Sequence, residues 1–116
     1  MSDSRSIFTK IIAREIPADI VFESDSVIAF RDIAPQAPVH LLVVPTTEEF
    51  ANVAELAAGN PALLAELVSV AQKLADEHAG GQYRLIFNTG ETAGQTVFHV
   101  HAHVLGGNLE EGTLGH

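Results

Sequence analysis

The chain contains no cysteine among its 116 residues. This absence excludes disulfide bonds, a thiolate nucleophile and zinc held by cysteine ligands, so any metal site would need histidine or carboxylate ligands. Long apolar runs are also missing, since none approaches the roughly 20 residues of a membrane-spanning helix. The polar residues 1–6 lack the apolar stretch of a signal peptide. We therefore expect a soluble cytoplasmic domain.

Basic residues are scarce as well. Six lysines and arginines stand against fifteen aspartates and glutamates, which gives a formal net charge of −9 at pH 7. Because nucleic-acid polymers and anionic membranes are bound through basic contacts, this balance argues against both as partners. A local pocket for a small anion is still compatible with it.

The pattern of apolar residues predicts a single α+β domain. A short helix is expected over residues 7–12, capped by Ser4 or Ser6. A long helix is expected between Asn60 and the glycine pair 80–81. Five strands are predicted at residues 19–23, 27–31, 40–45, 83–87 and 97–105. Hairpins and one crossover helix make the sheet mainly antiparallel, and its open edge favours a homodimer.

Three histidines, His99, His101 and His103, alternate with apolar residues in the segment 97–105. A period of two is strand geometry, so all three imidazoles should project from one face of the sheet. Histidines among valine and phenylalanine make an unusual solvated face. Since same-face side chains lie roughly 6.6 to 7 Å apart, this row could act on one phosphate-sized group or hold a metal ion. The residues expected to pack on the opposite face are Val100, Ala102 and Val104.

Two chemistries fit the histidine row. In a metal site, His40 would add the ligand that a single strand cannot supply, but Glu91 is the only nearby carboxylate that could orient the imidazoles. In nucleophilic catalysis, one imidazole attacks phosphorus or an acyl centre, and its neighbours supply protons near neutral pH. The preceding loop favours this second chemistry, because glycines allow close backbone approach and uncharged polar groups can hold phosphate. These loop residues are Asn88, Gly90, Gly94, Gln95 and Thr96.

Residues 94–105, which read Gly-Gln-Thr-Val-Phe-His-Val-His-Ala-His-Val-Leu, resemble the signature of the histidine triad (HIT) family. Residues 30–40, which read Phe-Arg-Asp-Ile-Ala-Pro-Gln-Ala-Pro-Val-His, are similar to a second hallmark of its Hint branch, the purine-nucleotide-binding phosphoramidases. The similarity covers about residues 7–107 and leaves residues 1–5 and 108–116 as expected flexible tails. The resemblance implies a HIT-like fold that dimerises into a continuous sheet.

The resemblance also implies an activity, the hydrolysis of the P–N bond in purine nucleoside phosphoramidates such as AMP linked to an amine. It assigns His101 as the nucleophile that becomes nucleotidylated. His99 and His103 would orient this nucleophile and contact phosphate or shuttle protons. His40 would support the triad by hydrogen bonding, and no cofactor is implied.

The same resemblance assigns the nucleotide-binding residues. Asp32 would accept hydrogen bonds from the ribose hydroxyls, and an Asx turn is the alternative role for this aspartate. For the apolar residues of the purine slot, plain core packing is the alternative. The residues assigned to phosphate and leaving group are Asn88, Gly94, Gln95 and Thr96, with His101 and His103, and those assigned to the purine slot are Phe8, Ile11, Phe30, Ile33 and Leu42.

The chain departs from the family pattern at two places. Many bacterial relatives carry a Cys-x-x-Cys pair that helps to bind a structural zinc, whereas residues 6–9 read Ser-Ile-Phe-Thr, so no metal is expected. Residues 108–115 lack the Trp-Pro-Pro segment of Hint tails, so the leaving-group preference is not implied. The alternatives are a nucleotide-binding regulator with little turnover, a dinucleoside polyphosphate hydrolase or nucleotidyl transferase of the same family, and a metal-dependent hydrolase or lyase.

Overall fold

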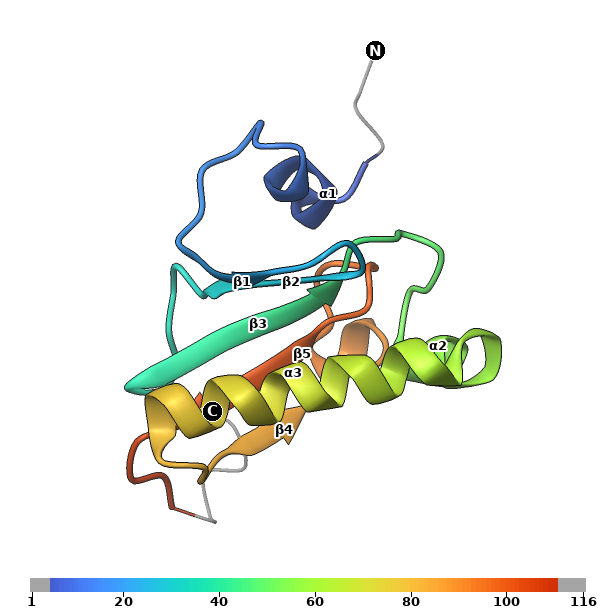
Figure 1. The fold of residues 1–116 in the computed structure, drawn as a ribbon. Coiled ribbons are helices and arrows are strands. Elements are labelled where there is room, and N and C mark those ends of the chain that lie inside the picture. The colour runs from blue at the N-terminus through green and yellow to red at the C-terminus, as the bar shows by residue number, and fades with distance from the viewer. Residues whose placement is uncertain (1–4, 111–116) are drawn as a thin grey trace.

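A five-stranded sheet carries helices on both faces in the computed structural model, which describes residues 5–110 (Figure 1). The predicted tails, residues 1–5 and 108–116, lie mostly outside this range. The elements in chain order are α1 (Ile7–Ile12), β1 (Ile20–Glu23), β2 (Val27–Arg31), β3 (Val39–Pro45), α2 (Val53–Gly59), α3 (Pro61–Ala79), β4 (Arg84–Ile86), the 3-10 helix η1 (Glu91–Ala93) and β5 (Ala102–Gly106). The strands lie in the order β1-β2-β3-β5-β4, and every neighbouring pair is antiparallel. The predicted α+β fold is confirmed.

The two faces of the sheet are covered by different helices, and the period of two in each strand decides which side chains meet which helix. In β3, Leu41 and Val43 pack in the core shared with α3, whereas Leu42 and Val44 pack toward α1. Figure 1 shows α3 running along one face while α1 lies over the other. All four side chains are buried, so apolar packing holds a helix on each side of the sheet.

The ends of the helices follow from their flanking residues. Asn60 caps the first turn of α3, Pro61 is its first helical residue, and Gly80 ends it at a φ of 63°. Glycine adopts this left-handed φ without strain because it has no Cβ. α1 is capped by Ser6, whose hydroxyl accepts a hydrogen bond from the Thr9 N–H. Within residues 5–110, none of the helices has the length and apolar character needed to cross a membrane.

The strand predicted over residues 97–105 is wrong in its first part, because β5 begins only at Ala102. In a continued register Pro45 would face Val100, and proline has no N–H to donate. The Val100 N–H donates instead to the carbonyl of Phe50, at 2.9 Å, in the segment that follows β3. The alternation of side chains persists, and the residues that pack in the core shared with α3 are Val100, Ala102 and Val104, as predicted.

α2 is a helix that the apolar pattern did not predict. Asn52 caps it by accepting a hydrogen bond from the Glu55 N–H, and the Glu55 carboxylate accepts one from the Ala51 N–H. This reciprocal arrangement is close to a capping box, which is the sequence signal that could have found the helix. Of its residues only Leu56 is buried, so the apolar period is too weak to indicate a helix.

Replacing Leu67 with alanine should lower the free energy of unfolding by about 2–5 kcal/mol, because Leu67 is fully buried between α3 and the sheet. Denaturant unfolding followed by circular dichroism measures this loss. The matched control is Val68→Ala on the same helix, whose residue is 37% exposed. This control should stay within about 1 kcal/mol of the wild type. Equal losses in the two variants would contradict the packing described above.

Candidate functional site

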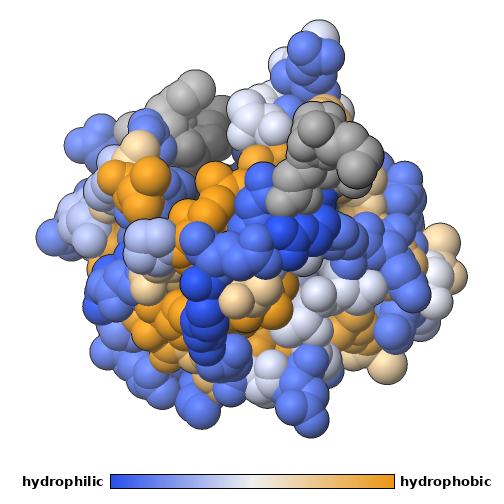
Figure 2. All heavy atoms as spheres, turned by 90° about the horizontal axis from the view of Figure 1, so that it is seen from above, coloured by the Kyte–Doolittle hydropathy of each residue, from blue (hydrophilic) through white to orange (hydrophobic). Residues whose placement is uncertain are grey.

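A cavity of about 260 Å³ lies between α1 and the sheet, on the face away from α3. Its volume is close to the lower end of the roughly 300–1,000 Å³ found for ligand pockets. Its walls are mainly apolar, and two imidazoles and one carboxylate lie among them. Figure 2, which looks onto the α1 side of the molecule, shows apolar residues exposed between polar ones. The cavity therefore combines an apolar wall with a small number of polar groups, as ligand sites commonly do.

Every residue predicted for the purine slot lines this cavity. α1 supplies Phe8 and Ile11, β2 supplies Phe30, and β3 supplies Leu42. Ile33 follows β2 and is 93% exposed at the edge of the cavity. The lining residues that the sequence analysis missed are Ile7, Ile16, Pro17, Ala18, Arg31 and Val97. No local pattern indicates them, because they come from separate segments that meet only in the folded chain.

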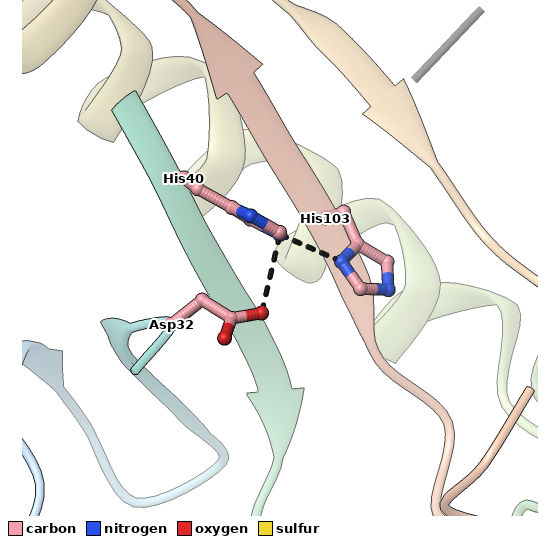
Figure 3. A group of neighbouring side chains, drawn as sticks. All are labelled: Asp32, His40 and His103. Carbon is pink, nitrogen blue, oxygen red and sulfur yellow. Dashed lines mark hydrogen bonds and ion pairs between the residues drawn. The ribbon is translucent and has the colours of Figure 1, made fainter. Parts of the chain in front are cut away.

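His103 lines the cavity and belongs to a chain of three polar side chains with His40 and Asp32 (Figure 3). The His40 Nε2 lies 2.9 Å from His103 Nδ1 and 3.4 Å from Asp32 Oδ2. The Gln36 N–H donates to His40 Nδ1, so the neutral His40 ring carries its proton on Nε2 and donates it to His103. His103 must then carry its own proton on Nε2.

The Nε2–H group of His103 is the only buried side-chain polar atom without a hydrogen-bond partner in residues 5–110. Burial, and then the neighbouring His101 and His40, lower the pKa of His103 to about 4, so the ring is neutral at pH 7. Burial also lowers the pKa of His40, against the opposing effect of the Asp32 carboxylate. Leaving a buried donor unpaired is unfavourable, and an acceptor oxygen of a ligand would satisfy it.

His101 lies beside His103 in the cavity, with the two ring centroids 5.1 Å apart. The Nδ1 of His101 lies 2.8 Å from the carbonyl oxygen of His99. A carbonyl only accepts, so the neutral His101 ring carries its proton on Nδ1 and keeps a lone pair on Nε2. Burial is the main cause that lowers the pKa of His101 and keeps the ring neutral at pH 7. A neutral imidazole nitrogen with a free lone pair can act as a nucleophile or as a base.

His99 lies in a different environment from the other two histidines. Its ring is fully buried, with Nδ1 2.6 Å from Ser6 Oγ and Nε2 2.8 Å from the Pro45 carbonyl oxygen. It does not line the cavity, and its ring packs against the Phe8 ring of α1 with centroids 5.7 Å apart. A direct contact between His99 and phosphate therefore does not fit this position, whereas an orienting role is compatible with it and stays a prediction.

The loop of residues 88–96 supplies fewer side chains to the wall of the cavity than the sequence predicts. Thr96 lines the cavity. Gln95 is 3% exposed, and its side-chain amide makes three hydrogen bonds to backbone groups of the protein itself. Asn88 and Gly94 do not line the cavity but lie against each other, since a Cβ built on Gly94 would be 3.8 Å from Asn88 Nδ2. The phosphate contacts predicted for these residues stay predictions.

Asp32 combines the two roles considered for it. Its Oδ1 accepts a hydrogen bond from the Ala34 N–H at 2.8 Å, which is the Asx turn given as the alternative. The carboxylate also lines the cavity, and its side chain is 21% exposed. Because a carboxylate has several lone pairs, this turn leaves acceptor capacity for a ligand. The ribose contact stays a prediction.

Asp32, His40 and His103 form a group whose potential metal-ligating atoms all lie within 4.8 Å of one another. A metal ion would need the lone pair of His40 Nε2. That nitrogen carries the proton, because His40 Nδ1 already accepts the Gln36 N–H. Metal binding would therefore require the loss of this hydrogen bond. The arrangement of Asp32, His40 and His103 therefore favours a chain of hydrogen bonds over metal coordination.

An α+β sheet with clustered histidines beside an apolar cavity is the arrangement of a histidine triad protein, and comparison with known proteins agrees. The chain matches the model of the HIT domain over residues 13–109. It is 45% identical over 113 residues to the purine nucleoside phosphoramidase of Escherichia coli, an alignment that covers 96% of this chain and 94% of that relative. The chain therefore belongs to the HIT domain family.

Solved structures give the same result. The HIT family hydrolase from Legionella pneumophila is 42% identical and superposes with a TM-score of 0.84, covering 90% of this chain and 95% of that one. The HIT family hydrolase from Clostridium thermocellum is 45% identical with a TM-score of 0.84, covering 92% of this chain and 94% of that one. At these levels of identity the likeness extends to the sequence as well as the fold.

The neutral His103 predicts a pH-dependent stability. The unfolded ring binds a proton near its ordinary pKa of 6.5, whereas the folded ring does so only near 4. The unfolded state thus takes up protons first, and the free energy of unfolding should fall as the pH is lowered from 6.5 to 4. Urea unfolding at several pH values measures this slope. His103→Asn should have a shallower slope, because it removes this ring. An unchanged slope in His103→Asn would argue against a neutral buried ring.

Proposed function

We propose that this chain hydrolyses the P–N bond of purine nucleoside phosphoramidates through a nucleotidyl-histidine intermediate on His101. One observation carries the proposal: the free Nε2 lone pair of His101 and the unpaired Nε2–H of His103 belong to adjacent rings in one cavity. The first group can attack an electrophile, and the second can donate to the negative oxygen that results. The purine nucleoside phosphoramidase of Escherichia coli, a relative of the same family, supports this choice of reaction.

A nucleotide is the substrate that best matches the groups around these rings. The apolar walls formed by Phe8 and Ile11 on one side and Phe30 on the other suit a flat, weakly polar base. Asp32 supplies a carboxylate acceptor for sugar hydroxyls at the edge of the same cavity. The phosphate would then lie at His101 and His103, with Thr96 beside it.

The reaction has two balanced steps. The His101 Nε2 lone pair attacks phosphorus, the P–N bond breaks, and the amine takes a proton from solvent as it leaves. The His103 Nε2–H donates to a phosphate oxygen during this step. Water then attacks the phosphorus of nucleotidyl-His101, and the bond from phosphorus to Nε2 breaks. The nucleoside monophosphate and free His101 are released, and the proton that the water loses returns to solvent.

Chelator-treated protein should hydrolyse a fluorogenic adenosine phosphoramidate without added metal. His101→Ala and His101→Gly should each lower kcat/KM by about a thousandfold or more, since the nucleophile is lost. Mass spectrometry of rapidly quenched wild type should detect an adenylyl adduct on His101. His78→Ala is the matched control, because this histidine lies in the last turn of α3 and does not line the cavity.

Three outcomes would contradict this proposal. Binding of AMP without turnover would favour a regulatory nucleotide-binding protein. Loss of activity on chelation, restored by a metal ion, would favour a metal-dependent enzyme. Faster cleavage of a dinucleoside polyphosphate than of the phosphoramidate would favour the hydrolase or transferase alternative within the family.

The proposal includes a homodimer. β4 is a three-residue strand at the edge of the sheet, so one of its sides has no strand partner among residues 5–110. A second copy that approaches this edge would extend the sheet and cover its free backbone groups. Light scattering after size-exclusion chromatography should therefore give about twice the chain mass of 12.3 kDa. A mass that stays at that of one chain from micromolar to near-millimolar concentration would contradict the dimer.

A further inference from the structure

Polar side chains gather beneath the first turn of α1, next to the cavity but outside its walls. The central contact joins Ser6 Oγ to His99 Nδ1 at 2.6 Å, across 93 positions of sequence. The other ring nitrogen of His99, Nε2, lies 2.8 Å from the Pro45 carbonyl oxygen. Both nitrogens of this fully buried ring are therefore paired within the protein.

The direction of these hydrogen bonds follows from their partners. The Pro45 carbonyl can only accept, so His99 Nε2 carries the proton and Nδ1 offers a lone pair. The Ser6 hydroxyl must then donate to His99 Nδ1. The same oxygen accepts the Thr9 N–H at 3.0 Å as the cap of α1. One hydroxyl thus joins the helix to the histidine.

Glu48 holds the same turn from the other side. Its carboxylate accepts hydrogen bonds from the Ser6 N–H and from the Thr9 hydroxyl. These bonds, that of the Ser6 backbone most of all, lower the pKa of Glu48. The carboxylate comes from the segment after β3, so it ties the N-terminal helix to the sheet.

The position of α1 matters for the cavity. α1 has only six residues, too few to be stable without tertiary contacts. Its Phe8 ring lies 4.9 Å from the His101 ring and 5.7 Å from the His99 ring, measured between centroids. The His99 carbonyl also accepts the His101 Nδ1–H. A shift of α1 would therefore move the Phe8 ring that packs on His101. A shift of His99 would move the carbonyl that accepts the His101 Nδ1–H.

We propose that Ser6, Thr9 and Glu48 form a polar latch that fixes His99 and holds α1 over the cavity. Ser6 acts as a positioning residue for His99 and, through it and Phe8, for His101. The latch itself is independent of the reaction, whereas its effect on catalysis rests on the proposed phosphoramidase function. Ser6 and Glu48 need not touch the substrate in this role.

The latch can be tested without any activity. Ser6→Ala removes the hydroxyl, and Ser6→Gly removes it while leaving a tolerated helix cap. In both variants, amide hydrogen exchange over residues 7–12 should become about tenfold faster, the equivalent of one lost hydrogen bond. The ¹⁵N shift of His99 Nδ1 should move toward that of an unbonded ring nitrogen. Ser6→Thr keeps the hydroxyl, and Glu48→Gln keeps an acceptor oxygen. The exchange rate over residues 7–12 in these two variants should stay closer to that of the wild type than the rate in Glu48→Ala.

The matched control is Ser26→Ala. Ser26 donates its hydroxyl to the Glu66 carboxylate, the same kind of contact, and neither residue lines the cavity. This variant should leave the exchange of residues 7–12 and the His99 shift unchanged. Wild-type exchange and an unchanged His99 shift in Ser6→Gly would overturn the latch.

The kinetic consequence is tested with the adenosine phosphoramidate. Ser6→Gly should raise KM about fivefold or more, because α1 forms the apolar wall of the cavity, and Ser6→Thr should restore KM to within about twofold of the wild type. If exchange and the His99 shift respond but KM and kcat do not, the positioning role is overturned. If they respond while the wild type has no turnover at all, the proposed function fails and the latch stands.

Discussion

The antiparallel pairing of β3 with β5 is the constraint on which the whole site depends. Its register places Leu42 opposite His103 and His40 opposite Leu105, so the two imidazoles meet diagonally across the strands, with centroids 5.2 Å apart. Because the side-chain period is two, a slip of one residue would turn His103 into the core beneath α3. The buried apolar side chains on the α3 face oppose such a slip, since each would lose its packing. Apolar packing on the α3 face therefore keeps His40 and His103 on the opposite face of the sheet.

Backbone groups decide which ring nitrogen of His40, His99 and His101 carries the proton, and the His40 ring in turn decides it for His103. The Gln36 N–H donates a hydrogen bond to Nδ1 of His40, and the His99 carbonyl accepts one from the Nδ1–H of His101. The carboxylate of Asp32 has a lesser part, because it lies 3.4 Å from His40 and also accepts a backbone hydrogen bond. Backbone groups cannot rotate away as side chains do, so the tautomers are fixed by the fold. This explains how closely spaced histidines can differ in which ring nitrogen offers a lone pair.

The parts of the fold that could be predicted from sequence are those set by local chemistry. Asn60, Pro61 and Gly80 mark the ends of α3, and the alternation after Val100 assigns each side chain to a face. The start of β5 could not be predicted, because it depends on a hydrogen bond from Val100 to the distant Phe50. For the candidate site, the resemblance to the family predicted five residues of the apolar wall. It did not predict the remaining apolar residues, which are Ile7, Ile16, Pro17, Ala18 and Val97. The directions of polar side chains could not be predicted, since an amide such as that of Gln95 can bond equally well to a ligand or to backbone.

The apolar wall of the cavity and the neutral state of His101 and His103 both result from burial. Burial is the largest cause that lowers the pKa of His101 and His103, and the Phe8 ring of α1 packs against the His101 ring with centroids 4.9 Å apart. A hydrated ring near its ordinary pKa would be partly protonated near neutral pH, and a protonated His101 has no lone pair with which to attack. The same burial leaves the His103 N–H without a partner, an unfavourable state that an incoming oxygen relieves. The helix that covers the apolar cavity thus also packs against His101, so the binding of a flat apolar ring and the proposed nucleophilic role of His101 would depend on the same few contacts.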